Sequence, residues 1–268
     1  MSQGLLKTID NRSLNADDII PLYESDTHSI YWIGSVEKSE EPEEIECNSY
    51  LLVDCGEAYI FEPGGLSHFQ GAFDKVCQKI SPFEISHIFM SHQDPDVCAS
   101  LPSWLQFNPD INIVCSHLWQ RFLPHYMVYH AQYLAMPDEG MTINLKSGGK
   151  LHCISAPYLH SPGNMVVFDS ISGFMFSGDI GAASQKSNAF KLVIEDWSEH
   201  IKSMTGFHQR YMGSTKAAAA FTASISHLPI QAMLPQHGQI FRHTEVQAFL
   251  DWFSTLPCGV DFLYPDKE

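Results

Sequence analysis

The chain of 268 residues is 44% hydrophobic and 17% charged, which is typical of a globular protein long enough to form a substantial core. Its formal net charge of −16 argues against nucleic acid and against an anionic membrane surface as partners, because like charges repel. The seven cysteines include no C-x-x-C pair, the first residues lack the apolar core of a signal peptide, and no apolar run is long enough to span a bilayer. We therefore expect a cytoplasmic protein with reduced cysteines.

Apolar runs predict the elements of the first half of the chain. Two β-rich runs, 50–53 and 58–61, flank the turn residues Cys55-Gly56-Glu57 and predict a hairpin. The segment 37–46 is rich in Glu and is typical of a solvated loop, with a docking site for a basic partner as the alternative. Apolar spacing further predicts strands at 29–33, 88–90 and 111–114 and helices at 69–80 and 99–107.

Aromatic, Met and His residues are concentrated between positions 118 and 141. Tyr126, Tyr129 and Tyr133 are spaced so that they would form one stripe along a helix. A stripe of this kind is typical of a core, and the alternative is the wall or lid of a pocket. The sequence leaves open the role of four side chains in this segment, His125, Tyr126, Tyr129 and His130.

The second half of the chain again contains predicted strands followed by predicted helices. Strands are predicted at 150–154, 165–169, 174–177 and 232–234, and helices at 198–211, 216–226 and 244–253. Strands with helices late in each half favour an α/β sandwich, in which two packed sheets are covered by helices. No linker enriched in Gly, Ser or Pro divides the chain, so we expect one domain over residues 1–268.

A loop of alternating potential ligands follows the predicted strand at 88–90. His92, Asp94 and Asp96 occupy every second position, and Pro95 together with Asp96 suits the first turn of a helix. Alternate residues of an extended loop project the same way, so His92 and Asp94 are expected to share a metal while Asp96 reaches a neighbouring one. The same residue types also occur in ordinary polar loops, so this loop alone does not define a metal site.

Three later segments share one design, in which a predicted strand is followed by a potential ligand. His160 lies in a loop after a strand, Asp179 comes directly after a β-rich run, and His237 lies between a strand and a turn. A single residue at such a place is more often a hydrogen-bonded loop residue than a ligand. The recurrence of the design after the His92 loop predicts a metal site formed by all four segments.

These segments together resemble the metallo-β-lactamase superfamily. The resemblance extends from about residue 30 to residue 242 and includes Asn48-Ser49-Tyr50-Leu51-Leu52 and Glu62-Pro63-Gly64. It implies an α/β fold, an αββα sandwich of two mixed sheets covered by helices, with a dinuclear metal site at its edge. The order of motifs that carries it is His92-x-Asp94-x-Asp96, His160, Phe176-Ser177-Gly178-Asp179 and His237-Gly238.

The second ligand position makes the sequence similar to the flavo-diiron branch of the superfamily. Zinc hydrolases of the superfamily usually have His at that position, whereas this chain has Asp94. Mixed imidazole and carboxylate ligands suit iron, with manganese or zinc as alternatives. The resemblance implies that His92, Asp94 and His160 bind the first iron, that Asp96 and His237 bind the second, and that Asp179 bridges them.

Val97 departs from the family pattern, which has a further His ligand directly after the position of Asp96. Water could complete the second site, or the second iron is open to a small ligand such as dioxygen. A nearby side chain such as Cys98 could also substitute, and a mononuclear or inert centre is the remaining alternative. Since Val97 is apolar and offers no proton, it favours diffusion of a gas and persistence of a bound oxygen adduct.

The chain ends at Glu268, with no room for the flavodoxin-like domain of flavo-diiron proteins, so no bound flavin is expected in it. The sequence thus resembles stand-alone oxygen-binding diiron proteins of anaerobic bacteria, which are often associated with chemotaxis. The resemblance implies an oxygen sensor rather than a turnover enzyme. In such a sensor two ferrous ions bind dioxygen as a peroxide-level diferric adduct, and a signalling partner, for example a histidine-kinase complex, detects the change.

Three other functions remain open at the level of sequence. One is an oxygen or nitric oxide reductase that uses a separate flavoprotein or rubredoxin as electron donor. Another is a zinc hydrolase, in which a metal-bound hydroxide attacks a thioester or lactone. The last is a degenerate domain kept for interaction alone. Relatives often pair head to tail as homodimers, while the sequence itself leaves the oligomeric state open.

Overall fold

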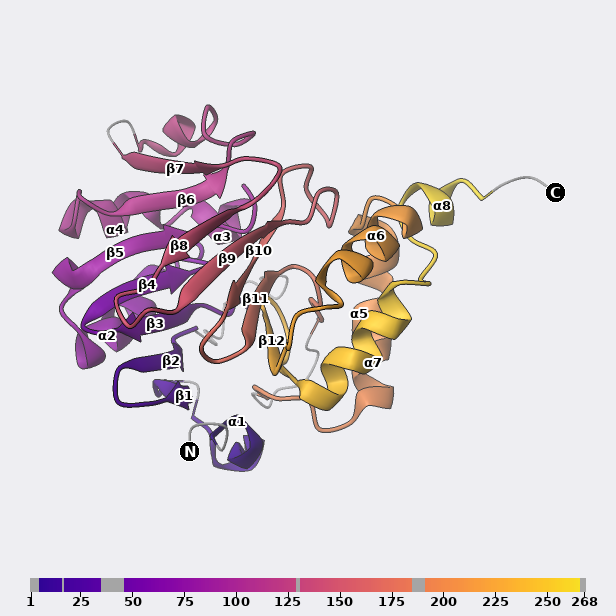
Figure 1. The fold of residues 1–268 in the computed structure, drawn as a ribbon, viewed down its shortest axis with the longest axis horizontal. Helices are drawn as coiled ribbons and strands as arrows, with labels where there is room; N and C mark the ends of the chain where they lie inside the picture. The colour runs from indigo at the N-terminus through magenta and orange to yellow at the C-terminus, as the bar shows by residue number, and fades with distance from the viewer. Residues whose placement is uncertain (1–4, 16, 35–45, 129–130, 185–190, 266–268) are drawn as a thin grey trace.

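Two mixed sheets packed face to face form the centre of the computed structural model, and helices cover their outer faces (Figure 1). The strand order is β1-β2-β3-β4-β5-β6-β7 in the first sheet and β13-β12-β11-β10-β9-β8 in the second. The predicted αββα sandwich is confirmed. The structure describes residues 5–15, 17–34, 46–128, 131–184 and 191–265.

The first half of the chain forms the first sheet, which is antiparallel from β1 to β4 and parallel from β4 to β7. Its strands are β1 (Ile20–Glu24), β2 (His28–Trp32), β3 (Tyr50–Asp54), β4 (Glu57–Phe61), β5 (Ile85–Phe89), β6 (Asn112–Ser116) and β7 (Gln132–Met136). Its helices are α1 (Leu5–Thr8), η1 (Asn11–Ser13), α2 (Phe69–Lys79), η2 (Pro82–Glu84), α3 (Pro95–Cys98), α4 (Leu101–Phe107) and η3 (Leu123–Tyr126).

The second half forms the second sheet, which is antiparallel except for the pair β11 and β12. Its strands are β8 (Met141–Asn144), β9 (Lys150–Ser155), β10 (Met165–Asp169), β11 (Phe174–Gly178), β12 (Ala232–Pro235) and β13 (Phe241–Arg242). Its helices are α5 (Trp197–Tyr211), α6 (Thr215–Ile225), α7 (His243–Phe253) and α8 (Val260–Leu263).

Three hydrophobic clusters separate the four layers. The central cluster lies between the sheets, where Phe61 of β4 stacks on Phe176 of β11 with ring centroids 3.6 Å apart. An outer cluster joins the first sheet to α2, α3 and α4, and another joins the second sheet to α5, α6 and α7. Along β10, Val167 belongs to the central cluster whereas its neighbours Val166 and Phe168 belong to the outer one, as the two-residue period of a strand requires.

The predicted strands and helices are confirmed, with shifts of a few residues at their ends, except between residues 118 and 141. The predicted helical stripe of tyrosines is wrong, because Tyr126 ends η3 while Tyr133 lies on β7. Met127, between them, has a φ of 66°, which ends the short helix. Tyr129 and His130 lie outside the described residues, as does most of the predicted loop at 37–46.

A buried ion pair joins the sheets at the end of the sandwich away from the predicted ligand loops. His28 of β2 places Nδ1 2.9 Å from Asp54 Oδ1 and Nε2 2.9 Å from Asp169 Oδ2. All three side chains are almost completely buried. Burial alone would lower the pKa of His28, but the hydrogen bonds and charges of Asp169 and Asp54 outweigh it and raise that pKa.

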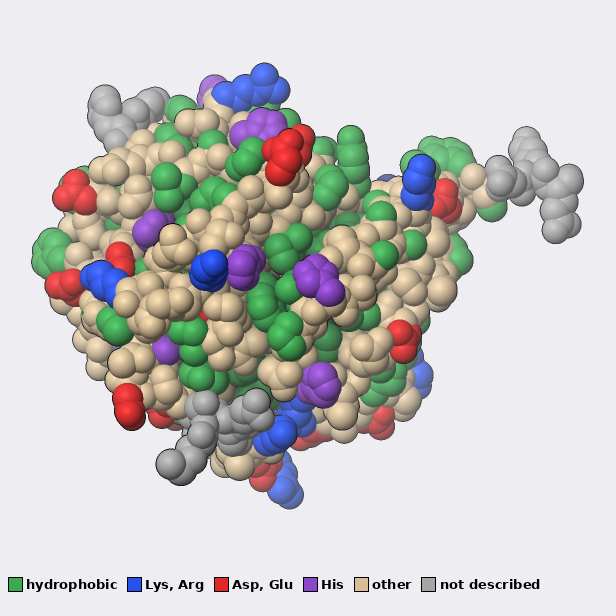
Figure 2. All heavy atoms as spheres, in the orientation of Figure 1, with side chains coloured by type: hydrophobic (Ala, Val, Ile, Leu, Met, Phe, Trp, Pro, Cys, Tyr) green, Lys and Arg blue, Asp and Glu red, His purple; other side chains and the backbone are tan. Residues whose placement is uncertain are grey.

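Asp and Glu side chains are spread around the edge of the face shown in Figure 2 rather than gathered into one patch. No helix within the described residues is long and apolar enough to cross a membrane.

Candidate metal centre

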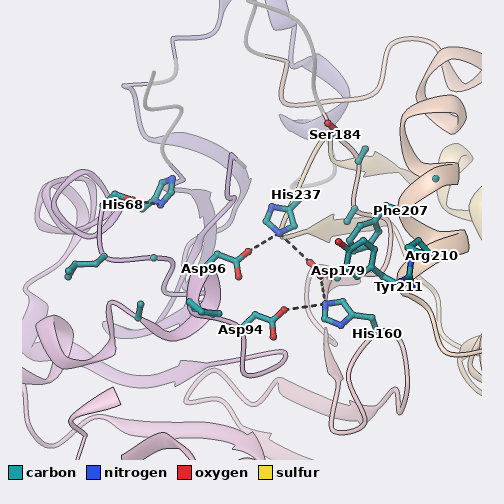
Figure 3. Close-up of a pocket in the computed structure, with 18 residues that line it drawn as sticks. His68, Asp94, Asp96, His160, Asp179, Ser184, Phe207, Arg210, Tyr211 and His237 are labelled. Carbon is teal, nitrogen blue, oxygen red and sulfur yellow. Dashed lines mark hydrogen bonds and ion pairs between the residues drawn. The ribbon is translucent and has the colours of Figure 1, made fainter. Parts of the chain in front are cut away.

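The four predicted ligand segments meet at one edge of the sandwich. His92 follows β5, His160 lies between β9 and β10, Asp179 follows β11, and His237 follows β12. Strand ends that face the same edge bring together residues that are far apart in sequence. Figure 3 shows five of the predicted side chains pointing toward one another from both halves of the chain, Asp94, Asp96, His160, Asp179 and His237.

The first group of ligand atoms contains His92, His160 and Asp179, one atom from each lying within 4.8 Å of the others. His160 Nε2 lies 2.8 Å from Asp179 Oδ2, and His92 Nε2 lies 3.7 Å from the same oxygen. Asp94 joins this group, because its Oδ2 is 3.6 Å from the Nε2 atoms of both His92 and His160. Two imidazoles and two carboxylates therefore converge on one point.

The second group lies on the other side of Asp179. His237 Nε2 is 3.1 Å from Asp96 Oδ2 and 3.5 Å from Asp179 Oδ1. Asp179 thus directs one carboxylate oxygen to each group. The structure brings together all six side chains predicted as ligands, in the two sets that the resemblance implies.

Two buried atoms of the centre indicate that it is built for a cation. Neither His92 Nε2 nor Asp179 Oδ1 makes a hydrogen bond to any described residue, although both are shielded from solvent. Buried polar atoms are normally hydrogen-bonded, because desolvation without a partner is costly. Imidazole and carboxylate donors in this number fit non-haem iron, manganese or zinc.

The imidazoles and carboxylates of the centre stabilise each other's charged forms. Burial opposes protonation of His92, yet the charges of Asp179 and its neighbours outweigh burial and raise the pKa of His92 to about 9. Burial likewise would raise the pKa of Asp179, but the positive charge of His92 and of the other two imidazoles holds it well below its usual range. Metal ions would therefore displace protons from the imidazoles on binding.

Outer contacts fix the orientation of the ligands. His237 Nδ1 lies 2.9 Å from the carbonyl oxygen of Glu46, so its Nε2 faces the centre, and Gln236 Nε2 donates to Asp96 Oδ2 at 3.2 Å. Asn48 donates to the carbonyl oxygens of Pro235 and Gly238, both at 2.9 Å, which ties the His237 loop to the first sheet. Contacts of this kind set the tautomer and the orientation of a metal ligand.

Gly178 allows the two halves to approach closely. Its φ is 55°, and a Cβ atom at this position would lie 2.6 Å from Cβ and Oγ of Ser91. Ser91 precedes His92 and its Oγ lies 2.8 Å from His92 Nδ1. A glycine is therefore required where the Asp179 segment passes the His92 segment.

The centre lies in a cavity of about 790 Å³ between the two halves. Side chains of α5 form one wall, with Phe207, Arg210 and Tyr211 beside the imidazole of His160 (Figure 3). His68 is buried and lines the opposite side. Tyr126 donates to the carbonyl oxygen of Gln93 at 3.0 Å, so the aromatic segment does contact the His92 loop.

The structure also defines the surroundings of Val97, which stands where the flavo-diiron pattern has a further His ligand. Val97 is fully buried in the outer cluster of the first sheet. Cys98, named from sequence as a substitute, donates instead to the carbonyl oxygen of Asp94 at 3.0 Å. Sequence reasoning missed Cys47, whose ligand atom lies within 4.8 Å of those of Asp96 and His237. Cys47 belongs to none of the quoted motifs, so no sequence signal singled it out.

The protein has the metallo-β-lactamase fold, with four ligand segments that meet at one edge of the sandwich. Its structure is similar to flavodiiron cores. A family model described as "ODP family beta lactamase" matches residues 45–238. The chain belongs to this ODP family.

Solved structures support the assignment. The chain is 36% identical to a structure described as "Peroxy diiron species of chemotaxis sensor ODP", with a TM-score of 0.81 and coverage of 91% of this chain and 98% of that one. The apo state of the chemotaxis sensor ODP from T. denticola is also 36% identical, with a TM-score of 0.83 and coverage of 92% and 97%. A flavo di-iron protein mutant from Thermotoga maritima shares the fold at 24% identity, with a TM-score of 0.72 and coverage of 88% and 61%.

Curated relatives are longer than this chain. Diflavin flavoprotein A 1 from Synechocystis sp. is 29% identical over 198 residues, which is 73% of this chain and 34% of the flavoprotein. The chain therefore spans about a third of the length of that relative.

Proposed function

We propose that this chain binds two iron ions at the centre described above, binds dioxygen there, and acts as an oxygen sensor rather than a turnover enzyme. The observation that carries the proposal is that the two oxygens of the Asp179 carboxylate face different ligand groups. Oδ2 lies 2.8 Å from His160 Nε2, and Oδ1 lies 3.5 Å from His237 Nε2. A carboxylate directed at two ligand groups is suited to bridging two metal ions. The similarity to a protein described as a diiron chemotaxis sensor supports the choice of iron and of dioxygen.

Each side chain has a defined task in this proposal. His92, His160 and Asp94 would hold the first iron, and Asp96 with His237 the second, while Asp179 would bridge them. When bound, a pair of ferrous ions supplies the electrons that dioxygen accepts. The outer contacts of Gln236 and of the Glu46 carbonyl would keep the ligands oriented in both the reduced and the oxidised state.

The surroundings of the centre suit an apolar gas. Phe207, Ala182 and Ala183 give the cavity an apolar side, and Val97 adds no proton donor. Both halves of the chain contribute ligands, so we also propose that residues 1–268 act as a single domain. The change on oxygen binding would pass to a signalling partner through the surface of this domain.

An oxygen or nitric oxide reductase with a separate electron donor is the second candidate. The side chains of Asp94 and Asp96 are 37% and 38% exposed, so a donor could approach the centre. The match to proteins named diflavin flavoproteins relates the chain to flavin-containing proteins, the kind of donor that this candidate needs. Steady-state consumption of either gas in the presence of a flavodoxin and its reductase would support the reductase over the sensor.

Anaerobic reconstitution tests the proposal. The protein loaded with ferrous iron should contain two ions per chain and should develop a long-lived visible absorption band on exposure to oxygen. Asp179→Asn should weaken both metal positions and abolish the band, whereas Asp138→Asn, which changes a carboxylate with a 75% exposed side chain, should leave both unchanged.

Two results would contradict the proposal. Absence of a band in fully loaded protein would count against oxygen binding. Zinc in protein purified without added metal, together with cleavage of a thioester or lactone, would instead favour a hydrolase.

A further inference from the structure

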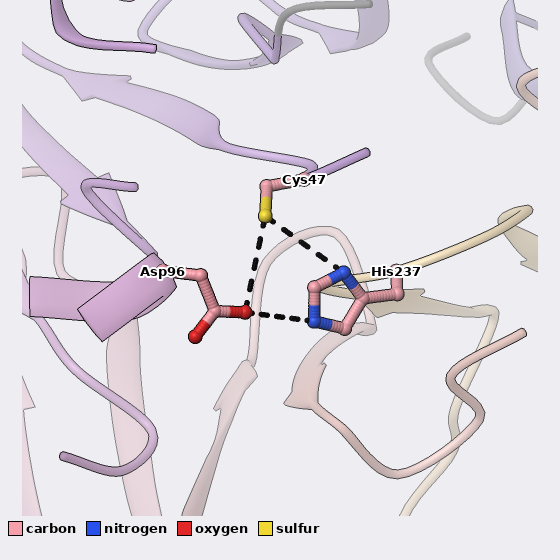
Figure 4. Close-up of side chains that lie close together, drawn as sticks. All are labelled: Cys47, Asp96 and His237. Atoms are coloured by element: carbon pink, nitrogen blue, oxygen red, sulfur yellow. Dashed lines mark hydrogen bonds and ion pairs between the residues drawn. The ribbon is translucent and has the colours of Figure 1, made fainter. Parts of the chain in front are cut away.

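The side chain of Cys47 lies beside Asp96 and His237, on the Nδ1 side of the imidazole whose Nε2 faces the centre. Cys47 Sγ lies 3.9 Å from Asp96 Oδ2 and 3.8 Å from His237 Nδ1, and Figure 4 shows the thiol pointing toward both side chains. One ligand atom from each of the three residues lies within 4.8 Å of the others. A thiolate, an imidazole and a carboxylate are donors that transition metals accept together.

This second position has fewer donors than the first. His92, Asp94 and His160 all face the first group, whereas among the described residues the predicted ligands of the second are Asp96 and His237 besides the shared Asp179. Val97, where the family pattern has a His, is fully buried among apolar side chains and cannot ligate.

The Asp179 carboxylate gives an independent indication that a cation completes the second position. Asp179 is 3% exposed, and its Oδ1 makes no hydrogen bond to any described residue. That oxygen is directed at the same position, 3.5 Å from His237 Nε2. The imidazoles offset the charge of this carboxylate, and a metal ion at the second position would give its buried Oδ1 the direct partner that hydrogen bonding does not.

We propose that Cys47 supplies a thiolate ligand to the second metal position, in place of the His that the family pattern has at Val97. The proposal rests on the proposed function, which is what puts a metal ion there. On binding, the S–H bond breaks, the proton leaves to solvent, and a metal–sulfur bond forms without any change of oxidation state. Three carboxylates offset three of the four positive charges of two divalent ions, and the thiolate offsets the fourth, which favours burial of the centre.

Cys98 provides a matched control. It is as buried as Cys47 and directly follows Val97, but its Sγ donates to the Asp94 carbonyl oxygen at 3.0 Å. Cys98→Ser therefore removes a nearby buried thiol without removing the proposed ligand.

Anaerobic titration with Co²⁺ tests the proposal on the full chain and on Cys47→Ser, Cys47→Ala and Cys98→Ser. The unmodified chain and Cys98→Ser should show thiolate-to-cobalt charge-transfer absorption in the near ultraviolet. Both Cys47 variants should lose this absorption while remaining folded by circular dichroism. Their affinity at the second position should fall by more than the roughly 10–100-fold that the loss of an outer contact costs.

X-ray absorption on the unmodified, zinc-loaded chain gives a test that needs no variant. A metal–sulfur distance of about 2.3 Å supports the proposal, and a spectrum without sulfur overturns it. Charge-transfer absorption that persists in the Cys47 variants overturns it as well. If two ions bind without a sulfur signal, only the Cys47 assignment fails, whereas a chain that binds no stoichiometric metal overturns both this assignment and the proposed function.

Discussion

The His28 ion pair gives a quantitative prediction about stability. His28→Leu removes the only partner that carries positive charge in this group and leaves the carboxylates of Asp54 and Asp169, both fully buried, facing each other between the sheets. Breaking a buried ion pair by removing one partner costs about 3–5 kcal/mol. At about 2–4 °C per kcal/mol for a chain of roughly this size, the melting temperature should fall by roughly 6–20 °C.

The stability lost in His28→Leu should depend on pH. The pKa of His28 is raised in the folded chain, so its contribution to the free energy of unfolding is fully present below about pH 6.5 and is lost as the pH rises through the folded value. Burial would raise the pKa of Asp169, but the hydrogen bond to His28, the charge of His28 and hydrogen bonds from Ser172 and Ile171 lower it, so its contribution is lost only as the pH falls below about 4. The difference between the two proteins should therefore be largest between about pH 4 and 6.5.

Thermal melts of both proteins in chelator, from acid to alkaline pH, measure this difference without interference from metal binding. His227→Gln, which changes an exposed histidine, is the control and should melt with the unmodified chain. Adding Asp169→Asn to His28→Leu should recover part of the loss, because one buried charge is removed. A fall in melting temperature below about 3 °C for His28→Leu, or one that does not vary with pH, would refute the reasoning.

Three further predictions concern the metal centre. Since the pKa of His92 is raised to about 9 in the metal-free chain, metal affinity should rise with pH up to that value, and a chelator-competition titration against pH that is flat would contradict this. Gln236→Leu removes the donor to Asp96 and should weaken metal binding about 10–100-fold, measured by the same competition. Gly178→Ala should lower the free energy of unfolding in urea by about 1–3 kcal/mol more than Gly56→Ala does. Gly56 also has a positive φ but has open space around it, so the comparison isolates the contact with Ser91, and equal losses would count against that contact.

The fold and the convergence of the six side chains predicted as ligands could be predicted from the sequence because each signal is local. A strand precedes each of the four ligand segments, and the ligand follows within a few residues of the end of that strand, as Asp179 follows β11. The twofold alternation of His92, Asp94 and Asp96 is likewise visible without tertiary structure. Local patterns of this kind are the ones that periodicity and turn chemistry predict well.

Other features depend on contacts that the sequence does not display. The segment at 132–136 was missed as a strand because its residues become β only by pairing with the neighbouring β6. The thiol of Cys47 lies near Asp96 and His237, which are 49 and 190 positions away along the chain. A lone cysteine between a Glu-rich segment and a strand carries no ligand pattern, so only the folded chain reveals its neighbours.

The same packing explains why Cys47 and His237 can act as a unit. Asn48, the next residue, receives a hydrogen bond from Trp32 Nε1 at 2.7 Å and donates to the carbonyl oxygens on both sides of His237. The carbonyl of Glu46, the preceding residue, orients the imidazole itself. Residues 46–48 therefore fix both the orientation of the His237 imidazole and the position of the Cys47 thiol. The His ligand that the flavo-diiron pattern has at Val97 can thus be replaced from a segment distant in sequence. This segment, residues 46–48, is already hydrogen-bonded to the loop of His237, another ligand of the same metal position.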